Sequence, residues 1–336
     1  MKVQNGIVTL KSIVPDWRKA IKNNTVIPND LCGGFYDGYW LNDIEGENYF
    51  FKISKKKGFS KELFNQILGE ELARMVGIET VHSKVVDVGN HFYGLLSFNY
   101  IKYNDEVFSG KSIVLQYLHH LYKDNLLELW LDSRLTKEEK AAFENENLDE
   151  MMQVLNSHNL NCNSLNFIWD ALYYHFKDFS QGNLITEKII KNLTQRYIFS
   201  FFIMNKDFHL KNWEVLDIHQ NYRLSPLYDI DLSFDKSFSD LNKNNSLQSY
   251  ETDIASIYED FERYFYSSAE SFRVEVYHQK EVLKPENVQA ALDNILSIYQ
   301  DPKLNSYADA IMTNYVSHYE QINAITKERT LWQTNT

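Results

Sequence analysis

The sequence predicts a two-lobed α+β protein, in which a small lobe of antiparallel β-strands with one helix precedes a larger, mainly α-helical lobe. Two observations support this prediction. Short aromatic-rich strands separated by turns occupy the first part of the chain, and after Tyr103 the apolar residues follow the 3.6-residue period of helices. The expected division is residues 1–102 and residues 103–336.

The composition is that of a globular chain. Its 336 residues can bury a sizeable core, 44% of them are hydrophobic, and 12 Gly and 5 Pro give no disordered bias. A net charge of −12 argues against nucleic acid as a direct partner, because nucleic-acid binders carry a basic face. We find no signal peptide and no apolar run long enough for a membrane span. A cytoplasmic location is expected, with secretion as an effector as the alternative.

Two aromatic strands near the N-terminus carry a candidate phosphate site. Gly33, Gly34 and Gly38 lie in the first strand region, and Lys52 lies near the end of the second. Glycines let backbone N–H groups approach phosphates, and a lysine can hold the phosphates by charge. The alternative is that these glycines mark a bulge or a turn.

A helix is predicted over residues 61–76, with Ser60 as its N-cap and Gly77 as its C-terminal stop. Strands over 80–88 and 93–100 then complete the small sheet and lead into a hinge over 99–102. Three polar residues of the helix share one face and are candidates to pair with Lys52: Glu62, Gln66 and Glu70.

The second lobe is predicted to contain six helices and a short hairpin. The helices are expected at 114–122, 148–156, 166–176, 186–204, 285–299 and 307–325, and the strands at 213–216 and 222–224. The polar stretch 235–252 is predicted to be either a mobile activation segment or an ordinary surface loop.

The most informative motif is NKDFHLKN at residues 205–212, followed by LSPLYD at 224–229. Asp207 precedes Asn212 by five positions, and Asp229 follows after the hairpin, which is the spacing that phosphoryl transfer uses. A carboxylate at Asp207 can orient an attacking hydroxyl, while Asn212 and Asp229 offer the oxygen ligands that Mg²⁺ prefers. Lys211 can lie along the transferred phosphate. Singly, each of these residues is also typical of a cap or a turn.

Together with LSPLYDI, this loop resembles the HipA-like serine/threonine kinases, the bacterial toxin-kinase family. A weaker similarity extends over roughly residues 30–300. The resemblance implies a two-lobed kinase fold that uses ATP and Mg²⁺ to phosphorylate protein Ser or Thr. It implies Asp207 as the catalytic acid/base, Asn212 and Asp229 as metal ligands and Lys52 as the phosphate anchor, with His209 as a further loop residue.

The same resemblance implies partners and shows departures. Family members phosphorylate aminoacyl-tRNA synthetases or other cellular proteins, and pairing with an antitoxin is common. Gln66 stands where the family has the helical glutamate that meets the lysine, so Glu62 or Glu70 is expected to substitute. Fewer residues precede the nucleotide loop than in full-length members, so the extra subdomain is expected to be absent or supplied by another protein.

The leading hypothesis is therefore an ATP-dependent protein kinase, whose small lobe binds the nucleotide with its base near Phe98 and Tyr100. A small-molecule or lipid kinase on the same scaffold is a second hypothesis. A nucleotide-binding pseudokinase or interaction module is the third, and the glutamine at position 66 favours it. A Walker loop at Gly110-Lys111-Ser112 is not expected, because Asp105 replaces its first glycine and no strand is predicted before it.

Overall fold

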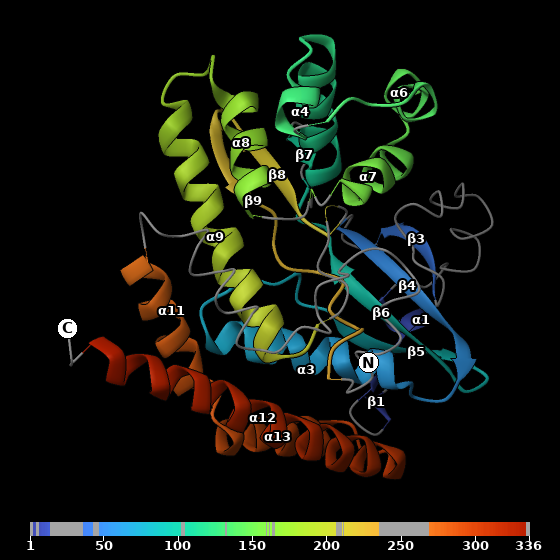
Figure 1. Cartoon of the computed structure of the whole chain (residues 1–336). Helices are drawn as coiled ribbons and strands as arrows, with labels where there is room; N and C mark the ends of the chain where they lie inside the picture. Colours follow the sequence, from blue (N-terminus) through green and yellow to red (C-terminus); the bar gives the residue numbers. More distant parts are fainter. Residues whose placement is uncertain are drawn as a thin grey trace.

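The structure is a computed structural model that describes residues 3–4, 7–13, 36–42, 47–101, 105–131, 133–158, 160, 162, 165–205, 210, 212–234 and 269–333. Figure 1 shows a twisted sheet on one side, helices on the other, and a second small sheet between them. The following predicted features lie outside the described residues: Gly33, Gly34, Asp207, His209, Lys211 and the stretch 235–252.

The first sheet has six strands in the order β1-β2-β5-β6-β4-β3. They are β1 (Val3–Gln4), β2 (Ile7–Thr9), β3 (Tyr36–Asn42), β4 (Asn48–Lys57), β5 (Lys84–Gly89) and β6 (Phe92–Phe98). All neighbouring strands are antiparallel except β2 and β5, which are parallel with Val8 opposite Val86. The N-terminal strands β1 and β2 were not predicted, because they are too short to show a period.

The two faces of this sheet are buried in different clusters. Val86 and Leu96 face Phe51 and the short helix α1 (Leu10–Ile13), whereas Val85 and Leu95 belong to the main core beneath α3. Successive side chains of a strand point to opposite faces, so neighbouring residues of β5 and of β6 belong to different clusters.

Helix α3 (Lys61–Met75) confirms the predicted helix and both of its ends. The Ser60 hydroxyl accepts a hydrogen bond from Leu63 N at 3.3 Å. At the other end Gly77 has φ +81°, its N–H donates to Arg74 O, and Ile78 N donates to Ala73 O. This pair of bonds is a Schellman ending, for which glycine is favoured because it has no Cβ.

The second sheet is antiparallel and consists of β7 (Glu106–Ser109), β8 (Glu214–Ile218) and β9 (Asn221–Leu224). The helices around it are α4 (Gly110–Lys123), α5 (Leu127–Trp130), α6 (Lys137–Glu144), α7 (Leu148–Ser157), α8 (Leu165–Phe176) and α9 (Gly182–Phe202). The predicted hairpin and the helices α4, α7, α8 and α9 are confirmed with boundary shifts, while β7, α5 and α6 were missed. No helix in the described part of the chain has the length and apolarity to cross a bilayer.

The last helices return to the first sheet. They are α11 (Ala269–Val282), α12 (Pro285–Ile298) and α13 (Pro302–Gln333), and both α12 and α13 pack against α3 (Figure 1). Phe64 of α3 lies 6.5 Å from Tyr307 of α13, measured between ring centroids. One hydrophobic core joins these helices to α3, so the end of the chain packs beside a helix from its first third.

The start of α4 differs from the sequence prediction, because a strand precedes it. Strand β7 leads directly into it, so a strand does precede Gly110-Lys111-Ser112. However, Gly110 N donates to Trp213 O and Lys111 N to Leu210 O, both at 3.0 Å, and Ser112 N donates to Ser109 Oγ. All three N–H groups that would cradle a phosphate are therefore occupied, two by carbonyls at and just after the end of the predicted catalytic loop and one by the N-cap Ser109.

We expect Gly110→Ala to destabilise the protein by about 1–3 kcal/mol, because the new methyl group would be forced into a packed site. A Cβ at this position would lie 2.5 Å from Trp213 Cζ2 and 2.7 Å from Leu210 O. Chemical denaturation measures the effect, with Lys111→Ala as the matched control in the same helical turn. Equal stability of the two variants would contradict the prediction.

Candidate active site

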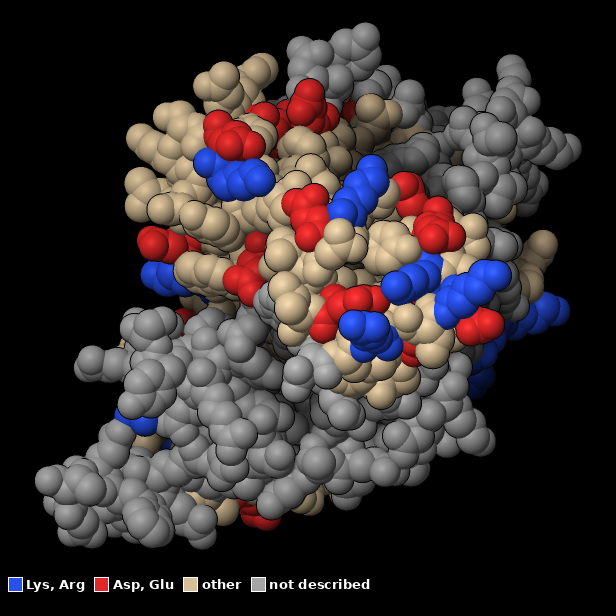
Figure 2. Space-filling model, turned by 45° about the horizontal axis from the view of Figure 1, so that its top comes forward, with Lys and Arg blue, Asp and Glu red and all other residues tan. Residues whose placement is uncertain are grey.

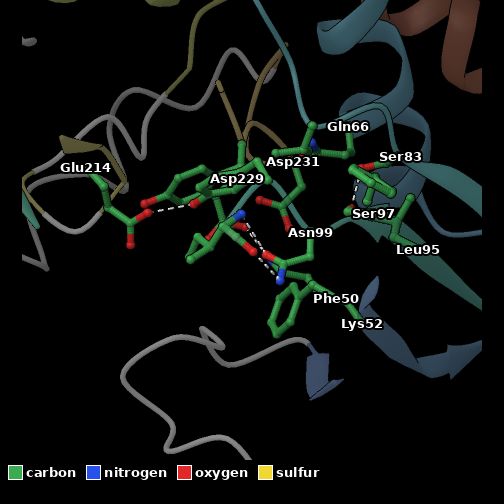
Figure 3. Close-up of a pocket in the computed structure, with 15 residues that line it drawn as sticks. Phe50, Lys52, Gln66, Ser83, Leu95, Ser97, Asn99, Glu214, Asp229 and Asp231 are labelled. Atoms are coloured by element: carbon green, nitrogen blue, oxygen red, sulfur yellow. Dashed lines mark hydrogen bonds and ion pairs between the residues drawn. The ribbon is translucent and has the colours of Figure 1, made fainter. Parts of the chain in front are cut away.

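An open cavity of about 820 Å³, its mouth included, lies between the first sheet, α3 and the start of β8 (Figure 3). Five predicted site residues line the cavity: Lys52, Gln66, Phe98, Tyr100 and Asp229. Asn99 and Ile101 of the predicted hinge line it as well. Further lining residues that sequence reasoning missed are Phe50, Val81, Ser83, Leu95, Ser97, Glu214, Tyr228 and Asp231.

Lys52 is positioned by the strands on either side of it. On β4 it lies opposite Gly38 of β3 and Leu95 of β6, so the predicted glycine is its direct cross-strand neighbour. Strand alternation places Lys52 on the face that α3 covers, together with Leu95. Its ammonium forms an ion pair with the Asp229 carboxylate, and the two side chains are 15% and 19% exposed. Figure 3 shows this contact at the centre of the cavity.

Asp229 has a left-handed backbone, with φ 56°. A side chain other than glycine pays a conformational cost there, which Asp and Asn tolerate best. Helix α3 holds the residues that follow: Ile230 N donates to Gln66 Oε1 at 2.9 Å, and Asn65 Nδ2 donates to Asp231 O and Ser233 O. The strained position is thus fixed from outside the segment.

The three candidate partners on α3 have other contacts. Glu62 pairs with Lys56 near the surface at 2.9 Å, and Glu70 accepts a hydrogen bond from Ser83 N at 2.8 Å. Gln66 donates to Glu70 Oε1, also at 2.8 Å. Glu62, Gln66, Glu70 and Lys52 are all described, and none of the first three contacts Lys52 by a hydrogen bond or an ion pair. The expected pairing of Lys52 with α3 is therefore replaced by pairing with Asp229.

The hinge after β6 is held by its own side chains. Asn99 Oδ1 accepts from Ile101 N at 3.0 Å and Asn99 Nδ2 donates to Ile101 O at 2.9 Å, which fixes a tight turn. Tyr100 stacks on Tyr228 with ring centroids 6.2 Å apart, and its hydroxyl donates to Glu214 Oε2 at 2.6 Å. These contacts join the hinge to β8 and to the residue before Asp229.

Burial sets the electrostatics beneath the hinge. Desolvation raises the pKa of the Glu214 carboxyl, and the hydrogen bond from Tyr100 offsets part of this rise. The pKa of the Tyr228 hydroxyl is likewise raised by burial and by the nearby acids Glu214 and Asp229. The buried Arg196 donates to Ser225 O, and desolvation lowers its pKa to about 10.

The predicted metal ligands are placed by different elements. Asn212 is buried beside Trp213, at the loop end that α4 holds, and it does not line the cavity. Asp229 and Asp231 both line the cavity. Within the described ranges no cluster of three or more His, Cys, Asp or Glu forms a complete metal cage. Mg²⁺ needs only one or two carboxylates besides phosphate and water oxygens, so the donor set of Asp229 and Asp231 fits it.

The surface in Figure 2 shows Lys and Arg interspersed with Asp and Glu over the described part of that face. Such a mixture lacks the continuous basic area that phosphate backbones require.

Comparisons with known proteins give a family and a fold. The profile of the family described as "HipA-like C-terminal domain" matches residues 39–296. The structure is similar to the Helicobacter pylori proinflammatory kinase CtkA, at 11% identity and TM-score 0.54, over 93% of this chain and 97% of that chain. It is also similar to HipA of Shewanella oneidensis MR-1, solved with HipB and operator DNA, at 12% identity and TM-score 0.60, over 94% and 72% of the chains. No curated protein sequence matches.

We expect Glu214→Gln to remove a pH dependence of stability. Because the fold raises the pKa of Glu214 above its unfolded value, the folded protein binds more protons than the unfolded chain between those two values. The contribution of Glu214 to the free energy of unfolding is therefore complete below its unfolded pKa, and it is lost as the pH rises through its folded pKa. Thermal unfolding from pH ~4.5 to ~7.5 should show the wild type losing stability relative to Glu214→Gln.

The matched control is Glu187→Gln on the exposed side of α9. Its curve of thermal stability against pH should be parallel to that of the wild type. A Glu214→Gln curve that also runs parallel to the wild type would contradict the assignment of this slope to Glu214.

Proposed function

Because the chain belongs to the HipA-like C-terminal domain family, we propose that it is a kinase that uses ATP and Mg²⁺ to phosphorylate a serine or threonine hydroxyl of a protein. The observation that carries this proposal is the contact between Lys52 and Asp229 inside the cavity. Residues distant in sequence thereby place a cation and an anion side by side, as a site for phosphates and a metal requires. The kinase folds of CtkA and HipA support the same reading.

In this proposal each residue has a role that follows from its chemistry. Lys52 holds the phosphates by charge. Asp229 and Asp231, which both line the cavity, would supply oxygen ligands to magnesium, and the metal would neutralise charge on the transferred group. Asn212, the second ligand that the family resemblance implies, does not line the cavity. Asp207 orients the acceptor hydroxyl and takes its proton, and Lys211 lies along the transferred phosphate. The hinge residues Phe98 to Ile101 receive the base.

The non-enzymatic alternative rested on the glutamine at position 66. In the structure Lys52 has a carboxylate partner in Asp229, so the lack of a glutamate at Gln66 does not leave the lysine without an acid. This observation favours phosphotransfer over a pseudokinase or interaction module. A small-molecule or lipid substrate differs from a protein only at the acceptor, and a substrate screen separates these classes.

The proposed partners are proteins. The Shewanella oneidensis HipA structure contains HipB and operator DNA, and on that likeness we assign this chain a protein partner of antitoxin type. The interspersed charges of Figure 2 support protein rather than nucleic acid as the direct contact on that face.

Incubation of the purified protein with Mg-ATP, followed by intact mass measurement, tests the proposal. We expect one or more added phosphates on the wild type. In Asp207→Asn and Asp229→Asn the rate of phosphate addition should fall by a factor of about 10² or more. Asparagine is the better replacement at position 229, because it tolerates the left-handed backbone that alanine disfavours. Asp309→Asn on the exposed side of α13 is the matched control.

Undiminished transfer by Asp229→Asn would refute the assignment of that carboxylate. A wild type that gains no phosphate and is not stabilised by Mg-ATP would support the interaction module instead. No added phosphate together with clear thermal stabilisation would identify a nucleotide binder whose acceptor is another molecule.

A further inference from the structure

The Gln66 side chain has only one orientation that satisfies its neighbours. It is 4% exposed on α3, its Oε1 accepts from Ile230 N at 2.9 Å, and its Nε2 donates to Glu70 Oε1 at 2.8 Å. A backbone N–H can only donate and a carboxylate can only accept. The amide must therefore turn its oxygen to Ile230 and its nitrogen to Glu70, so its orientation follows from chemistry.

Glu70 is the group that fixes this orientation. It is 1% exposed, and its second oxygen accepts from Ser83 N at 2.8 Å. Each carboxylate oxygen thus has an N–H donor, and the Arg74 guanidinium lies 4.0 Å away. A buried carboxylate is tolerated when it is hydrogen-bonded in this way. The Ser83 hydroxyl in turn contacts the Ser97 hydroxyl at 2.7 Å on the wall of the cavity.

The other end of this chain of hydrogen bonds is the backbone beside Asp229. Ile230 N belongs to the residue that directly follows the left-handed Asp229. The Ile230 side chain packs on Gly69, where a Cβ would lie only 2.6 Å from Ile230 Cδ1. Helix α3 therefore holds Ile230 by its backbone and by its side chain, directly after Asp229.

We propose that Gln66 and Glu70 are a positioning pair: Glu70 orients the Gln66 amide, and the amide holds Ile230 so that Asp229 faces Lys52 in the cavity. The proposal rests on the proposed function, in which Asp229 acts in phosphoryl transfer. Neither residue of the pair is assigned a chemical step. What the pair requires is one amide and one carboxylate, since two carboxylates this close cannot both ionise and two amides would oppose donor to donor.

Exchange of the two side chains tests this requirement. Gln66→Glu puts two buried carboxylates in contact, whereas the double variant Gln66→Glu/Glu70→Gln can restore every hydrogen bond with the roles reversed. In the double variant, a carboxylate at position 66 accepts from Ile230 N and from the new amide, whose oxygen accepts from Ser83 N. Glu187→Gln, on the exposed side of α9 and away from the pair, is the control.

The charged and titratable groups around the pair determine its pH response. Among the described residues they are Glu71, Arg74 and His82 on and after the helix end, Lys52 on β4, Asp229 and Asp231 beside Ile230, and Tyr299 after α12. These groups are the same in the wild type and in all three variants. A difference in pH profile between the variants therefore reports the exchanged pair.

We expect Gln66→Glu to lower the phosphoryl-transfer rate roughly 10- to 100-fold at neutral pH, because a misplaced reacting group has a cost of this order. Its rate should recover as pH falls and one carboxylate takes up a proton. The double variant should return to within about threefold of the wild type with the wild-type pH profile. Glu187→Gln should match the wild type throughout. A fully active Gln66→Glu, or a folded double variant that stays as slow as Gln66→Glu, would overturn the proposal.

Amide hydrogen exchange of the peptide that contains Ile230 gives a readout that does not depend on activity. Its protection should fall in Gln66→Glu and return in the double variant. If this pattern is observed while the wild type transfers no phosphate, the positioning pair stands and the kinase proposal fails. If the wild type is active and exchange at Ile230 is the same in every variant, the positioning pair is refuted and the kinase proposal stands.

Discussion

The irregular segment 227–234 is held by hydrogen bonds from other parts of the chain, and the geometry of the cavity depends on them. Leu227 N donates to Glu79 O, Phe234 N donates to Ile203 O, and the two side chains Asn65 and Gln66 bind the residues in between. Buried backbone groups need such partners, since a segment without regular structure cannot supply them itself. The positive φ of Asp229 persists because these contacts over-determine it.

Local signals in the sequence were enough to predict the elements that bracket the site. Helix α3 could be predicted with its N-cap and its glycine ending, because a helix of this length has a clear period and both end signals are local. Lys52 and Asp229 could be proposed as site residues because strand, loop and hairpin motifs fix their neighbourhood. Their direct contact, across 177 positions, could not be predicted from either motif alone.

The residues that sequence reasoning missed have no local signal. Glu214 begins a strand and reads as an ordinary acid, yet Tyr100 reaches it across 114 positions. Asn65 lies within a helix, where asparagine is usually exposed, but it is 3% exposed and bonds to two carbonyls of the segment after Asp229. Only the packing of α3 against that segment gives these side chains their roles, and packing is a property of the whole chain.

The cover of α3 by α12 and α13 has a consequence for the order in which the protein is made. Synthesis proceeds from the N-terminus, so α3 and its strands leave the ribosome long before the two helices that bury Phe64 and the outer side of α3. Until those helices emerge, the nascent chain keeps an apolar surface of α3 open to solvent and to chaperones. Because α3 carries Gln66, which lines the cavity, the full packing of this wall of the cavity is a late step in biosynthesis.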